Sequence, residues 1–312
     1  MRILILGAGG TGGYFGGRLA QSGADVTFLV RPARAAQLRA DGLRIESPLG
    51  DAVFPVACAT ADELPALAQA RPFDLVLLSC KAYDLDSSIA AIAPAVGAGT
   101  AVLPILNGLL HYPVLDACFG AAKVVGGLCY ISATKAEDGR VRHLGGPAWI
   151  TFGERDGRDS ERTRALAALF DAAGVQCHRV DDIARAQWIK FTFLAALAAA
   201  TCTMRANIGS IVAGEGGADY LAAVHEECCA IAAAEGQPVP AEERALARQR
   251  LTQPGSPTTA SMLRDLQAGA PVEALQIVGD LVHRAAGHGI AVPYLQAAWV
   301  HLQAYQASQG RP

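Results

Sequence analysis

The chain has 312 residues, more than a single hydrophobic core usually organises, so we expect two domains. Its composition, 52% hydrophobic and 18% charged, excludes an extensively disordered protein. The formal net charge of -3, without long runs of either sign, argues against nucleic acid as a partner, so small molecules are the expected ligands.

The N-terminal half alternates short apolar runs with helical patterns. The first run, residues 3–6, is far shorter than the apolar core of a signal peptide, so we interpret it as a strand. Two glycine- and proline-punctuated stretches predict antiparallel excursions, one over residues 42–60 and one that turns at Asp138-Gly139 and leads to a strand over residues 148–152. Nearly continuous apolar runs, typical of a parallel sheet covered on both faces, follow at residues 26–30, 75–79 and 102–106.

The C-terminal half is almost wholly helical in pattern. After a predicted helix over residues 160–173 and a last strand over 175–180, Asp181 and Asp182 are candidate N-caps of a long helix. We therefore expect an α/β protein in which residues 1–180 form a doubly wound parallel sheet and residues 181–312 an all-helical domain. The apolar run at residues 191–204 is shorter than the roughly 20 residues of a membrane span, so it predicts a buried helix, no membrane partner and a cytoplasmic protein.

Eight cysteines occur without CxxC spacing, most of them within apolar segments. This pattern is typical of buried thiols in a reducing compartment, and we expect no disulfides. The adjacent pair Cys228-Cys229 could act as a redox device, but successive side chains on a helix point in different directions, which favours two packed thiols.

A glycine-rich turn follows the first predicted strand directly. Its residues, Gly7-Ala8-Gly9-Gly10-Thr11-Gly12, match GxGxxG and open a helical pattern that reaches about Gln21. In this position Gly7 permits the tight turn, Gly9 lets the backbone approach a pyrophosphate, and Gly12 lets helix and strand pack closely. The helix N-terminus adds N–H donors and the positive end of its dipole. The sequence therefore predicts a Rossmann-type dinucleotide-binding domain, with a glycine-rich turn that holds no ligand as the structural alternative.

The end of the second predicted strand decides between NAD and NADP. A dinucleotide site usually places an acidic side chain there, against the ribose. Here Val30 is followed by Arg31-Pro32-Ala33-Arg34 and no acid. A guanidinium pairs with a 2′-phosphate that a carboxylate would repel, so Arg31 predicts NADP (NADPH) as the cofactor. The alternative is a solvated arginine at a strand end.

Three later segments, taken with the glycine turn, resemble the ketopantoate reductase family, whose members reduce 2-dehydropantoate to pantoate with NADPH in pantothenate biosynthesis. The likeness covers essentially the whole chain and implies a 2-dehydropantoate 2-reductase type of oxidoreductase, acting on a small-molecule 2-oxo acid. It also implies that the helical domain carries the substrate-binding and catalytic residues. The segments are Leu106-Asn107-Gly108-Leu109, Gln187-Trp188-Ile189-Lys190, and Ser261-Met262-Leu263-Arg264-Asp265 followed by Val272-Glu273.

The resemblance also implies roles for single residues. Lys190 is the implied catalytic proton donor, and Asn107 would contact the nicotinamide and the substrate. Ser261 would bind the substrate carboxylate, while Glu273 would lie near the nicotinamide ribose or the substrate hydroxyl and pair with Lys190. The remaining implied contacts are Asn207 for the substrate and Lys81 and Thr134 for the cofactor.

The chemistry of ketone reduction agrees with a lysine in this position. Hydride arriving at the carbonyl carbon leaves negative charge on oxygen, which a cation stabilises and can protonate. Burial would lower the pKa of Lys190 towards neutrality and ease the transfer. Each residue taken alone has an ordinary interpretation: Asn107-Gly108 as a turn, Lys190 as the end of an apolar stripe, and Glu273 as a solvated helix carboxylate.

The chain departs from the family pattern in its substrate-facing residues. Leu194 and Ala198 stand one and two helical turns after Lys190, where family members usually carry asparagines, and Leu275 stands where many have aspartate. Each lost amide removes a hydrogen bond of about 1 kcal/mol, which predicts a more apolar pocket. A paralogue that reduces a bulkier or less hydroxylated 2-oxo acid is therefore an alternative.

Other classes of protein fit less well. Hydroxyisobutyrate and phosphogluconate dehydrogenases also join a dinucleotide domain to a helical one, but the GxxGxGxxxK motif around their lysine is missing near Lys190. A non-catalytic NADP redox sensor would need the glycine turn without Lys190, Ser261 and Glu273 together. No metal is expected, because His283 and His288 lack a carboxylate cluster to complete a site. The alanine-rich helical half is compatible with a homodimer.

Overall fold

The computed structural model describes residues 1–310, and the chain divides into two compact units. The first unit comprises Met1–Leu106 and His111–Ile183. The second comprises the chain from Ala184 onward together with a short segment, Asn107–Leu110, that interrupts the first unit in the sequence. Each unit encloses its own cluster of buried apolar side chains.

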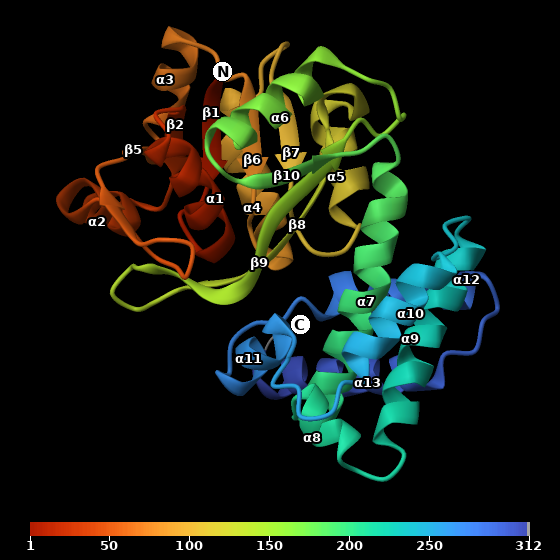
Figure 1. The fold of residues 1–312 in the computed structure, drawn as a ribbon. Coiled ribbons are helices and arrows are strands. Elements are labelled where there is room, and N and C mark those ends of the chain that lie inside the picture. Colours follow the sequence, from red (N-terminus) through yellow and green to blue (C-terminus); the bar gives the residue numbers. More distant parts are fainter. Residues whose placement is uncertain (311–312) are drawn as a thin grey trace. The chain divides into compact units, whose positions relative to one another are not determined.

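Five parallel strands form the central sheet of the first unit, and Figure 1 shows β2, β1, β6 and β7 side by side. Leu4 in the central strand pairs with Thr27 on one side and with Val76 on the other. Strand β6 is buried along its whole length, as expected for a strand covered on both faces, and the predicted parallel sheet is confirmed. In spatial order the strands are β5 (Ala57–Ala59), β2 (Asp25–Leu29), β1 (Arg2–Leu6), β6 (Leu75–Leu78) and β7 (Ala101–Pro104).

A second sheet in the same unit joins the two predicted antiparallel excursions. Strands β3 and β4 pair antiparallel, as do β8 and β9, so the excursion that turns at Asp138-Gly139 is confirmed and the one predicted over residues 42–60 is confirmed for residues 43–54. Residues 57–59 instead form β5, which pairs in parallel with β2. Strand β3 also pairs in parallel with β9, matching Ile45 with Val141, which the sequence did not predict. The strand expected over residues 148–152 is confirmed and forms the last part of β9. The strands are β10 (Gln176–Arg179), β9 (Val141–Gly153), β3 (Leu43–Glu46) and β4 (Ala52–Phe54) in spatial order, with β8 (Gly126–Lys135) on β9.

Helix α1 (Gly10–Gln21) packs against strands of both sheets because glycines line its contact faces. A Cβ on Gly16 would lie 2.8 Å from an Ile5 side-chain atom, and one on Gly17 would lie 2.6 Å from Ile45. The other helices of this unit are α2 (Pro32–Asp41), α3 (Leu64–Ala70), α4 (Leu85–Ile92), α5 (His111–Phe119) and α6 (Glu161–Ala172), with short 3-10 turns η1 (Ala82–Asp84), η2 (Ala93–Ala95) and η3 (Ala121–Lys123).

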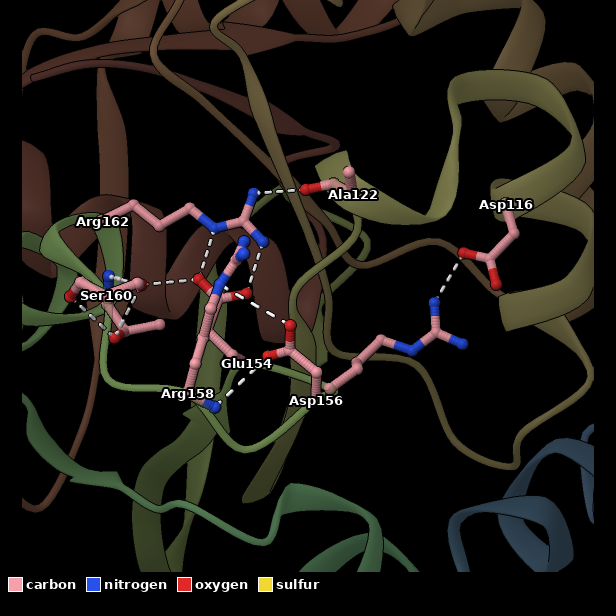
Figure 2. A network of polar contacts seen from close by, with 9 residues as sticks. Asp116, Ala122, Glu154, Asp156, Arg158, Ser160 and Arg162 are labelled. Atoms are coloured by element: carbon pink, nitrogen blue, oxygen red, sulfur yellow. Dashed lines mark hydrogen bonds and ion pairs between the residues drawn. The ribbon is translucent and has the colours of Figure 1, made fainter.

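A buried carboxylate ties the end of β9 to the start of α6. Glu154, only 4% exposed, accepts hydrogen bonds from Arg162 Nε at 2.6 Å and Nη2 at 2.5 Å, and from Ser160 Oγ at 2.6 Å (Figure 2). Burial alone would raise the pKa of Glu154, but the hydrogen bonds from Arg162 and Ser160 hold this pKa below its usual value. Ser160 also caps α6 by accepting from the Thr163 N–H.

The second unit is helical, and its longest helix, α7 (Ile183–Met204), starts directly after the predicted caps Asp181 and Asp182. The apolar run at residues 191–204 lies in α7 and contributes largely buried side chains to the core, as predicted. Within residues 1–310, no helix has both the length and the apolar character needed to cross a membrane. The other elements are α8 (Ile208–Val212), α9 (Gly217–Ala234), α10 (Ala241–Leu251), α11 (Ser261–Gln267), the π-helix η4 (Leu275–Gly279), α12 (Asp280–Gly287) and α13 (Pro293–Ser308).

All eight cysteines are free thiols, but fewer are buried than the apolar pattern suggested. Cys129, Cys202, Cys228 and Cys229 are buried, whereas Cys118 is exposed on α5. Burial raises the pKa of Cys229 to about 12, so this thiol is not a nucleophile at neutral pH, in agreement with two packed thiols at positions 228 and 229.

Candidate active site

The glycine turn of the first unit has the geometry of an anion-binding helix N-terminus. Gly7 follows β1 with a φ of +84°, and its N–H donates to the Leu29 carbonyl at 2.8 Å. Gly9 caps α1 without a side chain, and the first turn of that helix contains no acidic residue. A Cβ built on Gly7 or Gly9 would meet nothing within 4 Å, so space is left for a ligand beside the first N–H groups. These features fit the pyrophosphate of a dinucleotide.

The other glycines of the turn are needed for close packing. A Cβ on Gly10 would lie 2.6 Å from the Ala133 carbonyl oxygen and 2.9 Å from the Thr134 nitrogen of β8. At Gly12 it would overlap the Ser79 hydroxyl, in agreement with the predicted close approach of helix and sheet. The structure thus brings the backbone of Thr134, an exposed residue, against the start of α1.

Arg31 and Lys81 lie where the strands of the parallel sheet end. Arg31 caps α2 after β2, and its side chain is 85% exposed, with Nη2 3.5 Å from Asp84 Oδ2. Such an exposed ion pair contributes little to stability and can be exchanged for another anion. Lys81 follows β6 and caps the short helix η1. Ligands of open α/β sheets bind outside the carboxyl ends of the strands, where both residues lie.

Arg34 is a cationic residue at the glycine turn that the sequence analysis did not single out. Its Nη2 donates to the Ala8 carbonyl at 3.2 Å, and its Nη1 donates to Gln37 Oε1 at 2.6 Å. Burial and the neighbouring Arg44 lower the pKa of Arg34, although a guanidinium stays charged at neutral pH. A second arginine three residues after Arg31 is the sequence signal that could have found it.

In the second unit, the structure brings two of the predicted site residues together. Lys190 Nζ donates to Asn107 Oδ1 at 3.0 Å, and Lys190 is 8% exposed. Lys190 lies in α7, whereas Asn107 belongs to the segment Asn107–Leu110 that forms part of this unit. A hydrogen bond from the ammonium to an amide oxygen favours the charged form of the lysine.

The other predicted residues of the second unit have separate surroundings. Glu273 is 5% exposed and lies two residues before η4, which begins at Leu275. Ser261 is partly buried and begins α11. Asn207 caps α8, its side-chain oxygen accepting from the Ser210 N–H at 2.8 Å. The ion pair of Glu273 with Lys190 and the substrate contacts of Ser261 and Asn207 stay predictions.

Two of the three residues that depart from the family pattern lie on the same helix as Lys190. Leu194 and Ala198 follow Lys190 at intervals of four residues in α7, so all three share one side of the helix. Leu194 is partly buried and Ala198 is 1% exposed, so the positions expected to carry amides are aliphatic. Leu275 is 41% exposed, and no cluster of three or more potential metal ligands occurs within residues 1–310.

Sequence profiles of one family match both parts of the chain. The profile described as Ketopantoate reductase PanE/ApbA matches residues 3–157, and that described as Ketopantoate reductase PanE/ApbA C terminal matches residues 182–306.

Individual proteins are similar over nearly the full length. The uncharacterized oxidoreductase YkpB of Bacillus subtilis (strain 168) is 35% identical over 310 residues, covering 99% of this chain and 100% of that protein. The 2-dehydropantoate 2-reductase of Halobacterium salinarum is 32% identical, covering 95% of this chain and 96% of that protein. The solved structure of the 2-dehydropantoate 2-reductase from Geobacter metallireducens GS-15 has a TM-score of 0.88 and 31% identity, covering 97% of this chain and 99% of that one.

Proposed function

We propose that this chain, which belongs to the ketopantoate reductase family, reduces 2-dehydropantoate to pantoate with NADPH. Membership establishes the broader statement that the protein is an oxidoreductase that acts on a small 2-oxo acid with a nicotinamide cofactor. The observation that carries the proposal is the Lys190–Asn107 pair, a buried ammonium group whose Nζ lies 3.0 Å from an amide oxygen.

The pair suits the needs of the reaction. NADPH, when bound, supplies a hydride to the carbonyl carbon of the substrate. Lys190 stabilises the negative charge that develops on the carbonyl oxygen and gives it the proton from Nζ. Asn107 Oδ1 accepts one of the three ammonium N–H groups, which orients the donor before substrate arrives and favours its charged form.

The first unit would hold the cofactor. We assign the pyrophosphate to the glycine turn, residues 7–12, where N–H groups and the helix dipole favour an anion. Arg31 would pair with the 2′-phosphate, and the Arg34 guanidinium beside Ala8 supports the same preference for NADPH over NADH. Lys81 and Thr134 would complete the cofactor contacts, in line with their places after β6 and against α1.

Leu194 and Ala198 favour a second candidate function, reduction of a 2-oxo acid with an apolar side chain. Each hydroxyl group of a substrate that is buried without a hydrogen-bond partner costs about 1–3 kcal/mol of binding free energy. The aliphatic pair offers such a substrate no hydrogen-bonding group on that side of α7, whereas a branched or aromatic side chain would pack against it. Under this candidate Lys190 and Asn107 keep the same roles.

An assay of NADPH oxidation with a panel of 2-oxo acids tests the proposal. The panel compares 2-dehydropantoate with branched and aromatic 2-oxo acids that lack its hydroxyl group. The highest kcat/KM with 2-dehydropantoate supports the proposal, and the highest value with an apolar member supports the second candidate. In the latter case Leu194→Asn should shift the preference towards 2-dehydropantoate. Tight NADPH binding without turnover of any member would instead identify a redox sensor and contradict both.

A further inference from the structure

The segment that carries Asn107 rests on a backbone carbonyl of the second unit. Gly108 has a φ of +76°, and a Cβ built on it would overlap the carbonyl oxygen of Gln276 and lie 3.3 Å from the carbonyl carbon. Glycine is therefore required at this position for two reasons, the left-handed backbone conformation and the close approach of the Gln276 carbonyl. A backbone oxygen cannot move aside as a flexible side chain can.

The carbonyl belongs to a helical turn that is itself fixed in place. Gln276 lies in the π-helix η4, whose neighbouring residues Ile277 and Val278 are 2% and 0% exposed. A Cβ on Gly279 would lie 3.0 Å from two ring atoms of Trp299 in α13, so the end of η4 packs tightly against that helix. π-helical turns are rare and occur frequently at functional sites.

We propose that the contact between Gly108 and Gln276 is a positioning device for the proton donor, which holds Asn107 where its Oδ1 accepts from Lys190 Nζ. This inference rests on the proposed role of Lys190. Any side chain at position 108 must push the segment off the Gln276 carbonyl, and Asn107 moves with it. Gly108 and Gln276 act through Asn107 and are therefore positioning residues. The expected effect is large, because a misplacement of about 1 Å at a reacting group can reduce turnover roughly 100-fold.

The test compares Gly108→Ala with a matched glycine variant, Gly236→Ala. Gly236 lies in the same unit with a φ of +75°, but its Cβ would meet nothing within 4 Å, so it shares the backbone strain and not the contact. Gly108→Asn further separates the backbone strain from the contact, because asparagine tolerates a left-handed φ while its Cβ still meets the Gln276 carbonyl. Thermal unfolding and NADPH binding of all variants check that the fold is kept.

Two readouts follow the effect to Lys190. The first is kcat on the best substrate, alone and in an Asn107→Ala background. The second is the side-chain NMR titration of Lys190, which needs no turnover and is resolvable because the chain has only four lysines. We expect both variants at position 108 to lower kcat about 100-fold and the titration midpoint by about one pH unit, with Gly236→Ala changing neither. In the Asn107→Ala background, the change at Gly108 should have no further effect.

Several outcomes would overturn the inference. One is a Lys190 titration that is unchanged in Gly108→Ala, and another is a wild-type kcat in Gly108→Asn. A third is that the change at Gly108 still causes its full loss of kcat, or its full titration shift, when Asn107 is already replaced by alanine. If the wild-type protein turned over no 2-oxo acid, the proposed function would fail, while the titration would still decide whether Gly108 positions Asn107 against Lys190.

Discussion

Replacing Asn107 by alanine should move the pH dependence of the reduction. The wild-type amide oxygen lies 3.0 Å from Lys190 Nζ, and the lysine is only 8% exposed, so solvent screens this bond weakly. A hydrogen bond to a charged group contributes about 1.5–3 kcal/mol, and about 1.4 kcal/mol corresponds to one pH unit. Loss of the acceptor lowers the pKa of Lys190, so the descending alkaline limb of kcat should shift down by about one to two pH units.

The sign of this shift follows from the proposed role of Lys190 as the proton donor. Reduction needs the protonated ammonium, so activity is present below the pKa of Lys190 and is lost as pH rises through it. Asn107→Asp is the matched variant, because a carboxylate near the ammonium raises that pKa and should move the limb upward. Steady-state NADPH oxidation measured from neutral to alkaline pH gives both limbs. Limbs that stay in place in both variants, or move in the same direction, would refute the proposed action of Asn107 on Lys190.

Two further predictions concern the first unit. Arg31→Ala should weaken NADPH binding about tenfold while leaving NADH binding nearly unchanged, since only NADPH carries the 2′-phosphate. Equal losses of affinity for the two cofactors in calorimetric titrations would show that Arg31 does not bind the 2′-phosphate. Arg162→Ala leaves the Glu154 carboxylate buried and should reduce the free energy of unfolding by about 3–5 kcal/mol in urea at neutral pH, against little change for Arg158→Ala, whose side chain is 58% exposed. Because the pKa of Glu154 is depressed in the folded protein, its ion pair with Arg162 stabilises the fold at pH values above the unfolded pKa. The difference in free energy of unfolding between the wild type and Arg162→Ala should therefore shrink as pH falls, and a difference that stays constant would contradict this account.

The parallel sheet and the long helix could be predicted from sequence because their signals are local. Apolar runs mark β1, β2, β6 and β7, and a glycine pattern directly after a strand marks the start of α1. Asp181 and Asp182 mark the start of α7 in the same way. Local patterns of this kind indicate buried strands and helix ends from the residues of each segment alone.

The joining of the two excursions into one sheet could not be predicted, because the pairing that links them is not local. Ile45 pairs with Val141 across almost a hundred intervening residues, and neither strand carries a sign of its partner. Gly145 and Gly146 have positive φ values yet lie within the continuous strand β9, which runs from the turn at Asp138-Gly139 through the strand expected over residues 148–152. Glycine in a strand weakens it without always ending it.

Some features of the candidate site also had a sequence signal, and others did not. The family resemblance supplied Lys190 and Asn107, and the structure places the two side chains in hydrogen-bond contact. The close approach of Gly108 to Gln276 had no sequence signal, because the residues of a π-helix look like those of any apolar helix. Arg34 contacts the glycine turn through a carbonyl of Ala8, which no side-chain pattern announces.

The most direct test of the central claim is the turnover of Lys190→Ala with NADPH and the best 2-oxo acid of the panel. Lys123→Ala serves as the control, since Lys123 lies in η3 of the first unit, outside the proposed site. A catalytic proton donor contributes about 100- to 10,000-fold, so kcat should fall by that factor while NADPH still binds with wild-type affinity. A kcat equal to that of Lys123→Ala would show that the buried ammonium takes no part in the reaction.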